Sequence, residues 1–144
     1  LWGARIVKCK ASEHDKAMSI IQALRHFTTY AYGTFLANLE PNLQQILQLS
    51  SPIYRLELMM VGRLFAQDPR LYADIIMSSQ QNYELISAYV ESLKPELELV
   101  ATKDAEEFTH RFLKAREFFG DYAGLFLKDS GALLAKLQDE KLNF

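Results

Sequence analysis

Apolar residues recur every three to four positions along almost the whole chain after Ser12. This spacing is typical of amphipathic α-helices that pack one face against a core. Glycine and proline, which interrupt regular structure, number only six and four among 144 residues. The pattern therefore predicts an all-α domain over residues 11–144, long enough to bury a sizeable core.

Capping residues and prolines divide this helical region into segments. Ser12 is expected to cap a long helix that reaches about Leu39 and ends before Glu40-Pro41-Asn42. Ser51-Pro52 and Asp68-Pro69 each place a capping side chain before a proline, which is favoured at the first helical position. The other expected segments are a short helical turn at Leu43–Leu49, a helix from Ser79 to about Ala101 that Pro95 should kink or split, and a last helix that Lys103-Asp104 caps and that runs to about Leu137.

The segment from Ser50 to Asp74 is apolar on nearly every side, yet it contains Arg55 and Arg63. A helix that is hydrophobic all round is expected to be buried, and burying an unpaired guanidinium is costly. Neither arginine has an acid three or four residues away, where helical neighbours lie. An anion from another helix, another chain or a ligand is therefore expected to meet at least one of them.

A line of short polar groups runs along the first long helix. At about 100° per residue its members lie on one face, flanked by apolar residues, and they are Asp15, Ser19, Gln22, His26, Thr29 and Gly33. A solvated face normally carries lysine and glutamate instead. The line therefore suits either a ligand-facing cavity or a polar network within the core.

The last helix carries aromatic residues at coiled-coil spacing. Its apolar positions alternate by four and three residues, which is typical of a helix–helix seam, and they are Phe108, Phe112, Ala115, Phe119, Tyr122 and Phe126. Gly120, Gly124 and Gly131 are weak points of this helix. The seam fits either the core of one bundle or an interface between two chains.

The first ten residues differ from the rest, because Leu1 to Cys9 has β-character without a partner strand in the sequence. We interpret residues 1–10 as the end of an upstream domain in a longer protein. A short edge strand that pairs with a second copy of the chain is the alternative.

Composition excludes several classes of function. The net charge of −2 offers no basic patch for nucleic acid, and no apolar run approaches a membrane span. The single cysteine, Cys9, indicates a reduced, cytoplasmic protein. No metal-ligand spacing, nucleophile elbow or glycine-rich dinucleotide fingerprint occurs.

Several longer motifs resemble one family, the C-terminal domain of prephenate dehydrogenase, in the form found in bifunctional chorismate mutase/prephenate dehydrogenases. The resemblance covers almost the whole chain. Its motifs are HD at 14–15, QALRHF at 22–27, SSPIYRLEL at 50–58, GRLFAQDP at 62–69, LYADIIM at 71–77 and FGDY at 119–122.

The resemblance implies an intertwined helical dimerisation domain that forms a homodimer and builds the prephenate side of an active site. It implies that residues 1–10, as a short β-strand, end an NAD-binding domain that carries the catalytic histidine. NAD would bind to that upstream domain, so this chain alone is expected to be inactive. The implied activity is the oxidative decarboxylation of prephenate to 4-hydroxyphenylpyruvate in tyrosine biosynthesis.

The resemblance also implies ligand-binding roles for four residues. Arg63 matches an arginine that grips the ring carboxylate of prephenate, and His26 matches a histidine of the same pocket that responds to the inhibitor tyrosine. Tyr72 stands where distant members have a tryptophan near the cleft, and Gln22 would line the pocket one turn before His26. Arg55 is left open between a pocket role and a protein partner. The alternative function is a tyrosine-sensing regulatory and dimerisation module without activity of its own.

Overall fold

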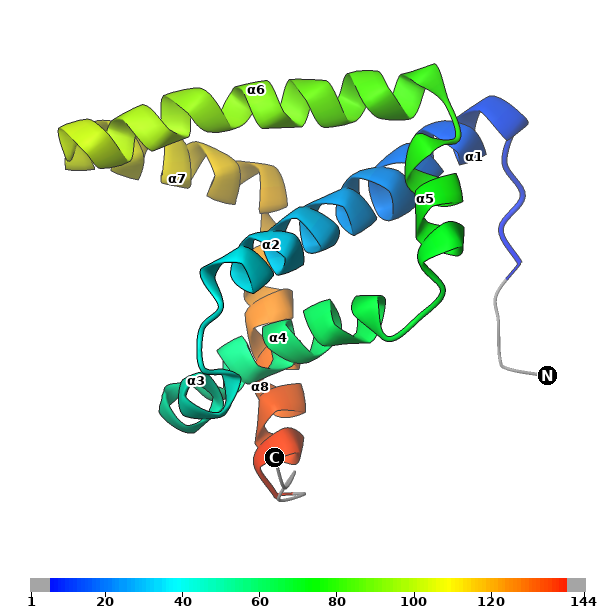
Figure 1. The fold of residues 1–144 in the computed structure, drawn as a ribbon. Helices are drawn as coiled ribbons and strands as arrows, with labels where there is room; N and C mark the ends of the chain where they lie inside the picture. The colour runs from blue at the N-terminus through cyan, green and yellow to red at the C-terminus, as the bar shows by residue number, and fades with distance from the viewer. Residues whose placement is uncertain (1–5, 140–144) are drawn as a thin grey trace.

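The computed structural model describes residues 6–139, and every regular element in that range is helical (Figure 1). The prediction of an all-α fold is confirmed. The elements are α1 (Ala11–Met18), the π-helix η1 (Ser19–Leu24), α2 (Arg25–Leu39), α3 (Leu43–Leu49), α4 (Pro52–Phe65), α5 (Pro69–Met77), α6 (Gln80–Thr102), α7 (Ala105–Phe119) and α8 (Asp121–Asp139).

Most of the predicted helix starts are confirmed by capping hydrogen bonds. The Ser51 hydroxyl accepts a hydrogen bond from the Tyr54 N–H at 3.4 Å, at the start of α4. Asp68 and Ser79 accept in the same way at the starts of α5 and α6. These side chains satisfy N–H groups that have no partner inside the helix, so local sequence is enough to define the starts.

The first helix begins two residues earlier than predicted. It starts at Ala11, and the Glu13 carboxylate accepts a hydrogen bond from the Lys10 N–H at 3.0 Å. The prediction of Ser12 as its cap is wrong, because a glutamate that reaches back to the cap residue can define a helix start.

The expected N-terminal strand is not formed by residues 6–10, which are exposed and have no regular secondary structure. An extended segment needs a neighbouring strand to complete its hydrogen bonds, and residues 6–139 contain none. Leu1–Arg5, on which the rest of this prediction falls, lie outside the described residues.

The last predicted helix is two helices. Gly120 has φ +50° and ends α7, and α8 begins at Asp121. Glycine adopts positive φ without the steric cost that other residues meet. Gly124 and Gly131 remain helical inside α8, and α6 continues through Pro95 without splitting.

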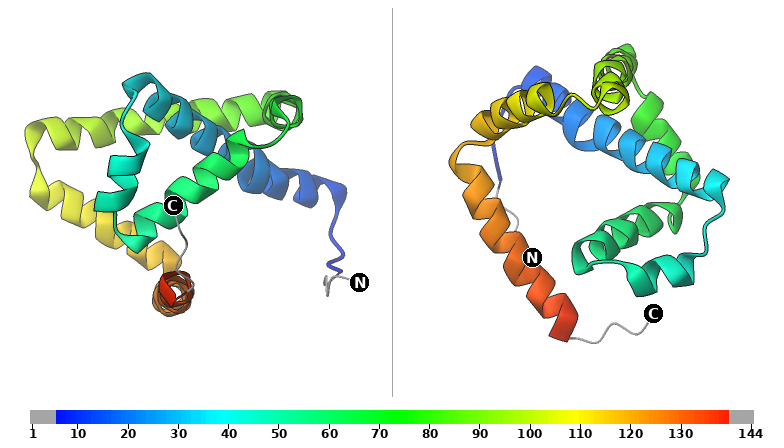
Figure 2. Two further views of the ribbon diagram at one scale, coloured as in Figure 1. Left: turned by 60° about the horizontal axis from the view of Figure 1, so that its bottom comes forward. Right: turned by 90° about the vertical axis from the view of Figure 1, so that its left-hand side faces the viewer.

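Helices α1, η1 and α2 form one continuous rod across the middle of the molecule (Figures 1 and 2). Helix α4 packs against α2, α6 packs against η1, and α5 contacts the rod between them. Helix α8 contacts α4 from a different direction. The rod therefore holds α4, α5 and α6 in position, and a site can form in the spaces where these helices meet.

The chain buries little apolar surface by itself. Among the described residues, the buried apolar side chains are Ala23, Val61, Leu64 and Leu99. The accessible surface is 12339 Å², whereas a compact monomer of 16.5 kDa is expected to expose about 7,500 Å². Large apolar faces are therefore uncovered in one chain.

This exposure corrects the expectation for α4. The sequence predicted a buried helix, but within α4 the structure buries only Val61 and Leu64. Arg63 is exposed and Arg55 is half-buried. The apolar residues on the other sides of α4 remain accessible because α2 and α8 cover only part of the helix.

Candidate functional site

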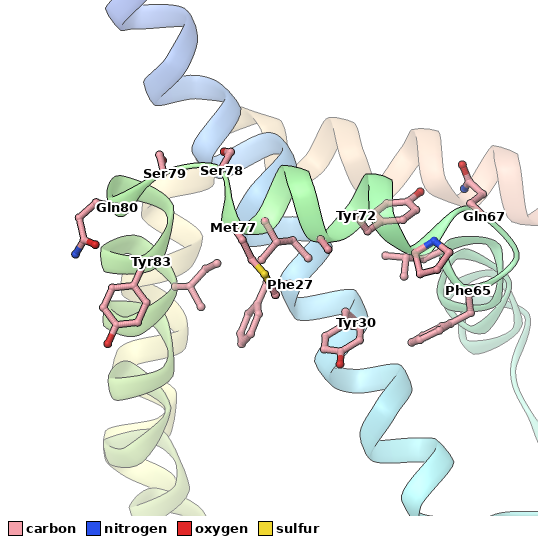
Figure 3. A pocket seen from close by; sticks show the side chains of 15 residues that line it. Phe27, Tyr30, Phe65, Gln67, Tyr72, Met77, Ser78, Ser79, Gln80 and Tyr83 are labelled. Atoms are coloured by element: carbon pink, nitrogen blue, oxygen red, sulfur yellow. The ribbon is translucent and has the colours of Figure 1, made fainter.

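A cavity of about 1040 Å³ lies between α2, α4, α5 and the start of α6 (Figure 3). Its lining is mainly aromatic and aliphatic, with polar groups at Gln67 and at the turn between α5 and α6. Phe27 and Tyr30 come from α2, Phe65 from α4, and Tyr72 from α5. No charged side chain lines it among the described residues. The cavity suits an apolar or aromatic group, and an anion would need a cation from outside this lining.

His26 lies beside this cavity and contacts one of its lining residues. The rings of His26 and Tyr72 are 4.9 Å apart and nearly perpendicular, at 82°, an edge-to-face geometry favoured by aromatic pairs. Burial lowers the pKa of His26 from its ordinary value, and the nearby charge of Arg25 lowers that pKa further. His26 is therefore held toward its neutral form.

Gln22 faces a different hollow of about 460 Å³ between the first helical rod and the turn that joins α5 to α6. Asp15, Ser19, Asp74 and Asn82 also line it. In an α-helix Gln22 and His26 would lie one above the other, but the π-helical turns of η1 change the register between them. One chain thus brings His26 and Tyr72 together and places Gln22 elsewhere.

Arg63 projects from the same helix that contributes Leu64 and Phe65 to the large cavity, but it does not line the cavity itself. Its carbonyl accepts a hydrogen bond at 3.0 Å from the side-chain amide of Gln67, which does line it. Among the described residues, no carboxylate forms an ion pair with the Arg63 guanidinium. Arg63 is exposed, and its guanidinium forms no ion pair within that part of the chain.

Arg55 has a protein partner. Its Nε donates to the Leu47 carbonyl at 3.1 Å and to the Ser50 hydroxyl at 3.3 Å. A cation at the C-terminus of a helix satisfies carbonyls that have no partner inside that helix. The expected anion is therefore not what meets Arg55: its partners are a neutral carbonyl at the end of α3 and a hydroxyl, and through them Arg55 ties α4 to α3.

Sequence reasoning did not single out the aromatic lining of the large cavity. Phe27, Tyr30, Phe65 and Tyr83 sit at ordinary apolar positions of their helices. Such positions predict a core, and only the three-dimensional packing reveals that they surround a hollow. The only pointer in the sequence was the resemblance, which selected His26 and Tyr72 for the same pocket.

The fold and this site define an all-helical domain whose apolar faces and aromatic cavity are left open in a single chain. Residues 10–114 match the family model described as "Prephenate dehydrogenase, dimerization domain". The chain belongs to this family, and the resemblance read from its motifs is confirmed. The match includes Gln22, His26, Arg63 and Tyr72, and it ends before α8.

Three relatives extend the comparison. The chain is 52% identical to the T-protein of Enterobacter agglomerans and 48% identical to that of Haemophilus influenzae, in each case over 98% of its own length. It is 32% identical, also over 98% of its length, to a probable arogenate/prephenate dehydrogenase of Methanocaldococcus jannaschii. It covers 38%, 37% and 32% of these three proteins. The chain therefore corresponds to about a third of each relative's length.

Within residues 6–139 no helix combines the length and the apolar character needed to cross a bilayer.

Proposed function

We propose that this chain is the substrate-binding and dimerisation part of an NAD-dependent prephenate dehydrogenase of the bifunctional chorismate mutase type. The complete enzyme would oxidatively decarboxylate prephenate to 4-hydroxyphenylpyruvate. Identities of 48–52% to T-proteins over 98% of the chain support this assignment. Residues 1–10 would end the upstream domain, and this chain alone would be inactive.

One observation carries the substrate assignment. In a domain of this family, Arg63 is exposed on a cavity-lining helix and forms no ion pair among the described residues. A guanidinium binds a carboxylate through two parallel hydrogen bonds, which sets the orientation of the ligand as well as its affinity. Arg63 would bind the ring carboxylate of prephenate.

The other proposed residues would act around the ring of the ligand. His26 and Tyr72 lie in contact at the edge of an aromatic cavity, where a six-membered carbon ring can pack against apolar surface. Gln22 faces the separate hollow of about 460 Å³, whose lining shares Ser78 and Ser79 with the aromatic cavity. It would reach the same ligand only if that ligand, or a partner chain, spans both hollows.

NAD would bind outside this chain. A dinucleotide is held by a glycine-rich turn between a strand and a helix, and residues 6–139 contain neither that turn nor a strand. The residues present do not fit the cofactor. The chain's own contribution is to bind and orient the substrate.

The test replaces Arg63 in the full-length protein that contains this chain. Arg63→Ala should raise the KM for prephenate about tenfold to a hundredfold, since a charge-assisted hydrogen bond contributes about 1.5–3 kcal/mol. Arg63→Lys should recover part of the loss because it keeps the charge. Arg116→Ala, an exposed arginine on α7, is the matched control. An unchanged KM in Arg63→Ala would remove the assignment.

The proposed quaternary state is a homodimer, in keeping with a family named for dimerisation. The chain exposes far more surface than a compact monomer of its mass. Phe108, Phe112, Tyr122 and Phe126 are all about half exposed or more on α7 and α8, which favours the two-chain interpretation of the aromatic seam. Sedimentation at micromolar concentration should give twice the mass of the chain, and a monomer would contradict the proposal.

A tyrosine-sensing module is the second candidate, and the aromatic lining of the large cavity favours it. A phenol ring would pack there as well as the ring of prephenate would. Calorimetry of the chain with tyrosine separates the candidates, because binding without the upstream domain would indicate a self-contained regulatory site. Absence of binding would exclude a self-contained regulatory site, and substrate binding would be the remaining proposal.

A further inference from the structure

The three histidines of the chain have chemically opposite neighbours at Nδ1. In His14 this atom lies 3.2 Å from a carboxylate oxygen of Asp15, and in His110 it lies 3.4 Å from a carboxylate oxygen of Glu107. In His26 it lies 3.5 Å from Nη1 of Arg25. An ionised carboxylate only accepts hydrogen bonds and a guanidinium only donates them. The contact therefore requires a proton on Nδ1 in His14 and His110, and a lone pair on Nδ1 in His26.

We propose that Arg25 is a positioning residue that holds His26 as a neutral imidazole with its proton on Nε2. His26 would then present an N–H donor to an acceptor oxygen of the ligand. This proposal rests on the proposed function only in placing His26 at the ligand site. The protonation state itself follows from the contact between the two side chains.

The surroundings of the ring act in the same direction. Among the described residues, the charged group against His26 is Arg25 of its own helix, and the titratable group packed on the ring is Tyr72 of α5. Burial disfavours the imidazolium form, and the arginine charge adds to that effect, so both lower the pKa of His26. A neutral ring with Nδ1 occupied has one free polar atom, the Nε2–H.

The proposal specifies the chemistry that His26 can recognise. An N–H donor binds a carboxylate, carbonyl or hydroxyl oxygen and offers nothing to an ammonium group. The positive charge of Arg25 beside the ring also favours an anionic ligand. His26 would thus donate a hydrogen bond to an oxygen atom of the ligand and would stay uncharged near neutral pH.

The test is a long-range ¹H–¹⁵N correlation spectrum of the full chain labelled with ¹⁵N-histidine, recorded well above pH 6.5. Such spectra separate the protonated ring nitrogen from the unprotonated one. His26 should show the proton on Nε2, whereas His14 and His110 should show it on Nδ1 and serve as internal references. Histidine-to-glutamine variants, one at a time, assign the three signals.

Two variants then test the role of Arg25. Arg25→Met removes the donor and the charge at similar length, so the pKa of His26 should rise while staying below 6.5, because burial remains. The preference for the Nε2 proton should weaken as well. Arg25→Lys keeps a cationic donor and should restore both properties, and Arg116→Met should leave His26 unchanged.

Two results would overturn the proposal. One is a proton on Nδ1 of His26 in the unaltered chain. The other is an Arg25→Met variant in which His26 titrates as before, with the His14 and His110 signals unchanged to show that the fold is intact. The readout involves no ligand, so failure of the Arg63 experiment leaves this result standing, and the reverse also holds.

Discussion

Gly33 of α2 lies directly against the ring of Phe65 of α4, where the two helices cross. A Cβ atom added to Gly33 would overlap that ring and would come within 3.0 Å of Cγ1 of Val61. Gly33 is buried although it is a poor helix former. A side chain at this position would therefore have to displace the Phe65 ring and press on Val61.

Gly33→Ala is expected to destabilise the chain by about 1–3 kcal/mol, since inserting a methyl group into a packed contact forces neighbouring groups apart. The midpoint of urea unfolding, followed by circular dichroism, measures the effect. Gly62→Ala is the matched control, because nothing lies within 4 Å of a Cβ at that position of α4. It should be neutral or stabilise the helix by up to about 1 kcal/mol. Equal effects at the two glycines would contradict this account.

The sequence was sufficient for most helix boundaries because their causes are local. Ser51, Asp68 and Ser79 each accept the backbone hydrogen bond expected of a cap. The π-helix from Ser19 to Leu24 was not predicted, since an apolar pattern with helical spacing does not distinguish the two kinds of helical turn. The sequence also could not predict that the last helix breaks at Gly120 and not at Gly124 or Gly131, because the three glycines are locally alike.

The candidate site was less predictable than the fold. His26 and Tyr72, both selected from the resemblance, lie in contact, whereas Gln22 faces a different hollow. The exposure of Arg63 does not agree with a buried helix, because an apolar pattern shows which faces avoid water and not whether one chain or two cover them. The donor–acceptor pair formed by Arg55 and the Leu47 carbonyl involves a backbone atom, which no side-chain pattern reveals.

Arg55→Ala is expected to destabilise the joint between α3 and α4 by about 1–3 kcal/mol, because the Leu47 carbonyl and the Ser50 hydroxyl lose a charged donor. Amide hydrogen exchange should speed up in Leu43–Leu49 before it does elsewhere. In the full-length protein the KM for prephenate should change little. Arg63→Ala should show the opposite combination, a raised KM with little loss of stability. A raised KM in Arg55→Ala at unchanged stability would place Arg55 in the ligand site.

Asn82 joins α5 to α6 from a buried position. Its side-chain amide donates to the Ile75 carbonyl at 3.1 Å and to the Ser78 hydroxyl at 2.9 Å. Asn82→Ala should cost about 1–3 kcal/mol in thermal or urea unfolding, because a part-buried carbonyl loses its donor. Asn82→Asp should cost more at neutral pH, since a carboxylate cannot donate to a carbonyl. The exposed neighbour Gln81, changed to alanine, is the control, and a variant of Asn82 as stable as that control would exclude the role.

Glu107 should make the stability of the α6–α7 pair depend on pH. Its carboxylate accepts hydrogen bonds from Arg111 at 2.7 Å and from His110 at 3.4 Å, and Arg111 also bridges to Glu96 on α6 at 3.1 Å. The hydrogen bond from Arg111, then that from His110, lowers the pKa of Glu107 from its ordinary value. A carboxyl group with a lowered pKa in the folded state contributes stability above its unfolded pKa. That contribution is lost as pH falls through the folded pKa.

Glu107→Gln should therefore be less stable than the unaltered chain at pH 7, and the difference should shrink as the pH falls below about 4.5, the ordinary value of this group. Urea midpoints measured at both ends of that range test the expectation. Raising the salt concentration at pH 7 should also reduce the difference, because these groups are exposed to solvent. Glu106→Gln, at the neighbouring position of the first turn of α7, is the control. A difference between Glu107→Gln and the unaltered chain that stays constant from pH 7 to pH 3 would show that the carboxylate charge is not what stabilises this contact.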